Sequence, residues 1–116
     1  MVPKHLVEFL DQVATTPHGR NGSLKVHLFR TYEILCTEKA EEAVCLAGLF
    51  HSIYGTTHYK VKSVSNREVI RSLIGERAER LVWLFCQWDR RQTIPSASAQ
   101  EMADLVILES ANRRTQ

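Results

Sequence analysis

The sequence predicts an all-α fold, a single compact bundle of about six helices. Apolar residues recur three and four positions apart along several segments, which is the spacing of one helix face, and no stretch alternates as a half-buried strand would. The 116 residues suit one domain with one core, and a hydrophobic content of 44% is sufficient for folding. We therefore expect one domain over residues 1–116, with the N-terminal helix and the tail 113–116 at its periphery.

Three helices are predicted in the first half of the chain, over residues 3–14, 23–37 and 40–53. Pro3 suits a first helical turn, and Ser23 is a typical N-cap. The segment between the first two helices, TTPHGRNG, is rich in turn formers. In the third helix Ala47 and Gly48 are small, so another helix can approach closely there.

Three further helices are predicted in the second half, over residues 66–73, 75–88 and 98–112. Ser65 with Glu68, and Ser98 with Glu101, have the spacing of a capping box, in which side chains and backbone cap each other reciprocally. Gly75 marks a break between the first two of these helices.

Charge and composition exclude several classes of function. A net charge of +2 is too small to indicate nucleic-acid binding, and the arginines form no stripe with interleaved aromatic residues. No apolar run approaches the roughly 20 residues that span a membrane, and the acidic N-terminal helix is unlike a signal peptide. The three cysteines, Cys36, Cys45 and Cys86, lie in apolar helical patterns, so we expect buried reduced thiols and a cytoplasmic protein.

Two histidines stand out because both fall on helix faces that are expected to be buried. His27 and His51 lie on consecutive helices, and a pair of facing imidazoles is a plausible start of a metal site. Asp104 in the last helix and Asp89 at the end of the fifth are the nearest candidate carboxylates. The structural alternatives are a core histidine satisfied by one hydrogen bond, a first-turn acid favoured by the helix dipole, and a solvated helix end.

The order of these residues resembles the HD-domain superfamily, which is named for a metal-binding pattern of a histidine, a His–Asp pair and a distal aspartate. His27, then His51 with Ser52, then Asp104, follow that order. The blocks AGLFHSIYGT and IGERAERL are similar to those of a small, stand-alone HD-like family, and the resemblance covers about residues 18–112.

The resemblance implies a divalent metal such as zinc, iron or manganese, bound by His27, His51 and Asp104. Superfamily members are mostly metal-dependent phosphohydrolases, and a minority are di-iron oxygenases. Ser52 stands in the place of the aspartate of the His–Asp pair, and a neutral hydroxyl is a poor ligand for a divalent ion. Three outcomes therefore stay open: one metal ion completed by His18 or water, a metal-free acid–base site, and a pocket that only binds.

We expect an enzyme of hydrolase or oxygenase type that acts on a small anionic molecule. His18, Arg20 and Tyr54 are the expected catalytic residues, because Arg20 can grip an anion and Tyr54 lies one helical turn beyond His51. His58, on the loop that follows, is a further candidate. Two alternatives are a non-catalytic binding module with a degenerate metal site, and an interaction protein whose helices form a homo-oligomer.

Overall fold

The computed structural model describes residues 2–13, 24–55 and 66–115, and it confirms the all-α prediction. The helices are α1 (Lys4–Val13), α2 (Leu24–Thr37), α3 (Glu42–Phe50), α4 (Arg67–Ile74), α5 (Glu76–Gln87) and α6 (Ala99–Arg114). No strand occurs in the three described ranges. None of the helices described is long and apolar enough to cross a membrane.

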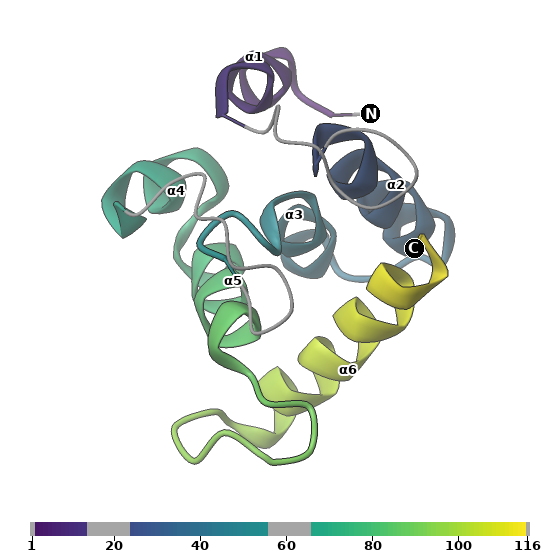
Figure 1. The fold of residues 1–116 in the computed structure, drawn as a ribbon, viewed down its shortest axis with the longest axis vertical. Coiled ribbons are helices and arrows are strands. Elements are labelled where there is room, and N and C mark those ends of the chain that lie inside the picture. The colour runs from purple at the N-terminus through teal and green to yellow at the C-terminus, as the bar shows by residue number, and fades with distance from the viewer. Residues whose placement is uncertain (1, 14–23, 56–65, 116) are drawn as a thin grey trace.

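Helix α3 forms the centre of the molecule. Figure 1 shows α2, α5 and α6 arranged around it, with α1 and α4 further out. Most of its nine residues are buried, including Leu49 and Phe50, because its sequence is apolar on nearly all sides. A helix that is hydrophobic all round is stable only when it is enclosed on all sides by other elements.

Several helix boundaries follow the predicted capping signals, but the helix predicted over residues 40–53 spans only Glu42–Phe50, and the predicted N-cap Ser23 lies outside the described residues. Ser98 and Glu101 form the predicted capping box at the start of α6. Gly75, with φ of 92°, separates α4 from α5 as predicted. The side chain that caps α4 is that of Asn66, which accepts a hydrogen bond from the Glu68 backbone N–H, whereas Ser65 lies outside the described residues.

Two further expectations differ from the structure. The tail predicted as peripheral is helical to Arg114, and Thr115 is only 8% exposed, because its hydroxyl reaches a buried imidazole. Cys45 and Cys86 are buried as expected, but Cys36 is exposed, since it lies in the last turn of α2 on the solvent side.

The small residues of α3 allow the close helix approach that was predicted. A Cβ atom placed on Gly48 would overlap Leu35 Cδ1 of α2, and it would lie 3.5 Å from Thr31 Cγ2 and 3.6 Å from Leu108 Cδ2. Gly48 thus lies where α2, α3 and α6 meet, and a larger residue fits only if the Leu35 side chain moves.

Replacing Gly48 by alanine is expected to destabilise the fold by about 1–3 kcal/mol, the usual range for overpacking a dense core. The free energy of unfolding in urea measures the effect. Adding Leu35→Val, which removes the overlapping methyl group, is expected to recover part of the loss. Unchanged stability of Gly48→Ala would contradict the close approach of α2 and α3.

Candidate functional site

His27 and His51 meet in the core. Their Nε2 atoms lie 3.1 Å apart, although the residues come from α2 and from the turn that ends α3. The side chains are nearly closed to solvent, with exposed fractions of 6% for His27 and 1% for His51. Helix packing therefore brings together two imidazoles from separate elements, and imidazoles can transfer protons or bind metal ions.

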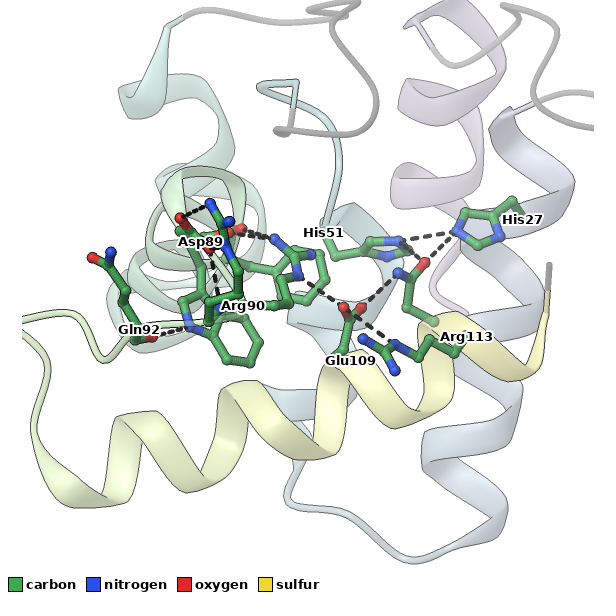
Figure 2. Close-up of polar contacts among 11 residues, drawn as sticks. His27, His51, Asp89, Arg90, Gln92, Glu109 and Arg113 are labelled. Carbon is green, nitrogen blue, oxygen red and sulfur yellow. Dashed lines mark hydrogen bonds and ion pairs between the residues drawn. The ribbon is translucent and has the colours of Figure 1, made fainter.

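Asn112 of α6 completes the group. Its Oδ1 atom lies 2.7 Å from His27 Nε2 and 3.0 Å from His51 Nε2, so three polar atoms form a small triangle (Figure 2). The Asn112 Nδ2 atom donates to Glu109 Oε1 at 2.8 Å. Because a carboxylate only accepts hydrogen bonds, this contact turns the amide oxygen towards the histidines.

Glu109 is held in place by two arginines. Arg90 Nε donates to its Oε2 atom at 2.8 Å, and Arg113 Nε lies 3.5 Å from the same oxygen (Figure 2). Burial raises the pKa of Glu109, but the hydrogen bonds from Arg90 and Asn112 outweigh it, so the pKa lies below its ordinary value. Glu109 is therefore a fixed anion that positions Asn112 without touching the imidazoles.

The other ring nitrogens fix the orientation of the two imidazoles. His51 Nδ1 lies 2.7 Å from the Gly48 carbonyl oxygen, which has no proton to give, so Nδ1 carries the hydrogen and Nε2 presents a lone pair. His27 Nδ1 lies 2.6 Å from Thr115 Oγ1, which also donates to the Asn112 carbonyl at 2.9 Å. When the Thr115 proton goes to that carbonyl, His27 Nδ1 is the donor and its Nε2 also presents a lone pair.

Helix α5 supplies the aromatic neighbour of His51, and the turn after α5 supports that neighbour. The Phe85 ring meets the His51 ring edge to face, with centroids 5.2 Å apart. Arg90 stacks on the Phe85 ring, at 4.4 Å from its centroid, and the Cys86 thiol donates to the His51 carbonyl at 3.1 Å. Arg90 thus supports the site by two routes, through Glu109 and through Phe85.

The structure does not bring Asp104 to the histidines. Its carboxylate accepts hydrogen bonds from Arg77 Nη2 and Gln100 Nε2, each at 3.0 Å. Asp104 precedes Asn112 by two turns of α6, about 12 Å along the helix axis, which is too far for one metal ion to be shared. The prediction that Asp104 lies beside the two histidines is therefore corrected, and the α6 side chain that contacts both of them is that of Asn112.

Tyr54 belongs to a different cluster. Its hydroxyl donates to Glu79 Oε2 at 2.8 Å, and burial together with this hydrogen bond raises its pKa above the ordinary range. Glu79 is 1% exposed and receives two hydrogen bonds from Arg67, at 2.7 and 2.9 Å. Arg67 also stacks on Trp83, at 4.2 Å from the ring centroid. Tyr54 is therefore committed to a buried ion pair, and its predicted role beside His51 is corrected.

The remaining predicted residues are placed as follows. His18, Arg20 and His58 lie outside the described residues. The Asp89 carboxylate accepts hydrogen bonds from Arg91 at 3.0 and 3.1 Å, so it is used at the end of α5 and not at the histidines. Within the described ranges, no three side chains drawn from histidine, cysteine, aspartate and glutamate form a group that could hold a metal ion.

Ser52 is buried beside the site and has an unusual feature. It is 3% exposed, and its hydroxyl has no hydrogen-bond partner in the part of the chain that the structure describes. Buried hydroxyl groups are normally paired, because leaving one unpaired costs about 1–3 kcal/mol. The Ser52 hydroxyl is therefore free to form a hydrogen bond with a polar group that enters the core.

Sequence reasoning missed Asn112, Glu109 and Thr115. A signal for Asn112 was present, since it continues the buried stripe of Leu105 and Leu108 at helical spacing, and a polar residue on such a stripe needs a partner. Thr115 gave no comparable signal.

Comparison with known protein families gives a match, which covers most of the chain before α6. The sequence model of a family described as "Domain of unknown function (DUF6817)" matches residues 9–90. The chain belongs to this family. The matched region contains both histidines and ends before α6, which supplies Asn112. No curated protein and no solved structure matches the chain.

The orientation of His51 can be tested by long-range ¹H–¹⁵N correlation of the imidazoles. At pH 8, above the ordinary imidazole pKa of about 6.5, His51 is expected as the Nδ1–H tautomer, because the Gly48 carbonyl can only accept. The exposed His5 provides an internal reference for an unconstrained ring. A neutral His51 with hydrogen on Nε2 would contradict the geometry.

The Glu79 cluster predicts acid sensitivity. Hydrogen bonds from Arg67 and Tyr54 outweigh the raising effect of burial and hold the pKa of Glu79 below its ordinary value. Stabilisation by the carboxylate is therefore complete above the ordinary glutamate pKa of about 4.3 and is lost as the pH falls through the lowered pKa. We expect Glu79→Gln to cost about 2–3 kcal/mol at pH 7, and this difference from the wild type should shrink between pH 5 and pH 3.

Unfolding in urea at a series of pH values measures this difference. Glu68→Gln, which removes an exposed carboxylate from the same pair of helices, is the matched control and is expected to change stability little. A pH-independent difference for Glu79→Gln would contradict the assignment.

Proposed function

We propose that this domain is an HD-like enzyme that acts on a small anionic molecule at one divalent metal ion held by His27, His51 and Asn112. The observation that supports the proposal is the triangle of Nε2, Nε2 and Oδ1 atoms, which is buried between α2, α3 and α6. Three acceptor atoms this close repel one another unless a hydrogen or a metal cation lies among them. The hydrogen is supplied by the tautomer of His27 that carries it on Nε2 or by protonation of an imidazole, and the cation by a bound metal.

The spacing of these atoms suits a metal ion. The three edges measure 2.7, 3.0 and 3.1 Å. Neighbouring ligands around an octahedral ion at about 2.1 Å lie about 3.0 Å apart, whereas tetrahedral ligands at that distance lie about 3.4 Å apart. Two imidazoles and one oxygen on one face of an octahedron are the donor set of non-haem iron and related sites, with Asn112 in place of the usual carboxylate.

The surroundings of the triangle support its use as a ligand site. Glu109 and Arg90 hold the amide oxygen in place, which is the role that outer residues play around metal ligands. The Ser52 hydroxyl offers a hydrogen-bonding group beside His51. A bound divalent ion would polarise a phosphoryl or carbonyl oxygen of the substrate, in the manner of a hydrolase or oxygenase.

The class of substrate rests on the HD-like resemblance, whose members act on phosphate esters and related molecules. We also assign the protein to the cytoplasm, because Cys36, Cys45 and Cys86 are free thiols and fit a reducing compartment.

A second function is supported by one specific observation, the neutrality of the donor set. Ser52 and Asn112 stand where carboxylates would supply negative charge, and no carboxylate of the described residues touches the imidazoles. If this donor set is too weak to hold a metal ion, His27 and His51 share a proton instead, and the domain is a non-catalytic binding module.

Metal content distinguishes the two functions. Protein purified without chelator or a histidine tag is expected to contain close to one equivalent of iron, manganese or zinc by elemental mass spectrometry. His51→Ala and Asn112→Leu should each lose most of it, since each removes one of three ligands. His5→Ala, which removes an exposed histidine of α1, should retain it.

Circular dichroism of each variant controls for folding. A wild-type protein that stays metal-free after incubation with each ion under reducing conditions would overturn the metal-dependent enzyme and leave the binding module.

A further inference from the structure

A groove lies on the outer side of the histidine site, between α2 and the end of α6. It has a volume of about 510 Å³, within the range of roughly 300–1,000 Å³ found for small-molecule sites. Its lining residues are Arg30, Glu33, Ile34, Thr37, Glu38, Arg114 and Thr115. Four of these, Arg30, Glu33, Ile34 and Thr37, come from one face of α2, because they follow one another at helical spacing, and Glu38 directly follows that helix.

The charges of the groove are balanced in sign. Arg114 donates to both carboxylate oxygens of Glu38, and its Nε atom donates to the Ser110 carbonyl at 3.2 Å. The charges of Arg114 and Glu38 therefore neutralise each other. Arg30 and Glu33 have no ion pair within the described part of the chain. Their spacing of three residues places a positive and a negative group side by side on the groove wall.

The floor of the groove joins it to the histidine pair. Ile34 is half-buried and supplies an apolar surface, and the buried Thr115 also lines the groove. The Thr115 hydroxyl lies 2.6 Å from His27 Nδ1 and donates to the Asn112 carbonyl. A molecule bound against the floor therefore contacts Thr115, whose hydroxyl in turn contacts His27.

We propose that this groove binds a small zwitterion, with its acidic group on Arg30, its amino group on Glu33 and its carbon chain over Ile34 beside Thr115. A guanidinium recognises a carboxylate or sulfonate through paired hydrogen bonds, and a carboxylate recognises an ammonium group. A ligand with a single charge satisfies one of these side chains and is repelled by the other. This site is separate from the metal-binding triangle and does not depend on it.

The test uses β-alanine as the zwitterionic probe, with propionate and propylamine as matched molecules that lack its amino or its acidic group. Protein labelled at the threonine methyl groups and the arginine side chains is titrated and followed by NMR. β-Alanine is expected to shift the Thr115 methyl and Arg30 Nε–H signals, and the two single-charge probes at equal millimolar concentration are not. Equal shifts with either single-charge probe, or no shift with β-alanine, would overturn the proposal.

Variants complete the test. Arg30→Gln and Glu33→Gln are each expected to weaken β-alanine binding about threefold or more, and the double variant to abolish it. Arg91→Gln, which alters an exposed arginine outside the groove, should bind as the wild type does. Binding should also move the imidazole ¹⁵N signals of His27 in the wild type but not in the isosteric Thr115→Val, and unmoved His27 signals in the wild type would place the ligand away from Thr115.

Discussion

The close approach of α2 and α3 at Gly48 is the constraint on which the rest of the structure depends. Without a side chain at this position, Leu35 and Thr31 of α2 can lie against the α3 backbone, while Leu108 of α6 lies on the same spot. The same residue offers its carbonyl oxygen to His51 Nδ1. One glycine therefore sets both the distance between the helices that carry the histidines and the direction in which one of the rings points.

Charge at the histidine site is controlled from a distance. Arg90 neutralises Glu109, Glu109 orients the Asn112 amide, and only the amide oxygen reaches the imidazoles. A carboxylate in direct contact would favour the protonated form of an imidazole and bind a cation more strongly. The neutral amide favours the protonated form less, so a cation bound as we propose would be held by the placement of the lone pairs more than by opposite charge.

The sequence predicted the fold well because helical periodicity and caps are local signals. The six helices, the break at Gly75 and the Ser98–Glu101 capping box all follow from residues close together in the chain. The burial of His27 and His51 was also predictable, since each falls on an apolar face.

The third member of the site could not be predicted in the same way. Asp104 and Asn112 both lie on the inner side of α6, and the choice between them depends on how far along α2 and α3 that helix is placed. This longitudinal position is set by long-range contacts, such as Arg77 with Asp104 and Thr115 with His27, which no local pattern encodes. Tyr54 was misplaced for a related reason, because the buried carboxylate that it meets comes from α5.

The position of Asn112 and Thr115 in the final turn of α6 has a consequence for how the buried rings exchange with solvent. Terminal turns of helices open far more often than helix centres, because fewer hydrogen bonds must be broken. Unwinding this one turn would withdraw both the amide oxygen and the hydroxyl from His27 while the other helices stay packed. Opening of this turn would therefore give solvent a route to the histidines, and the frequency of opening would limit how fast the two imidazoles exchange their protons by that route.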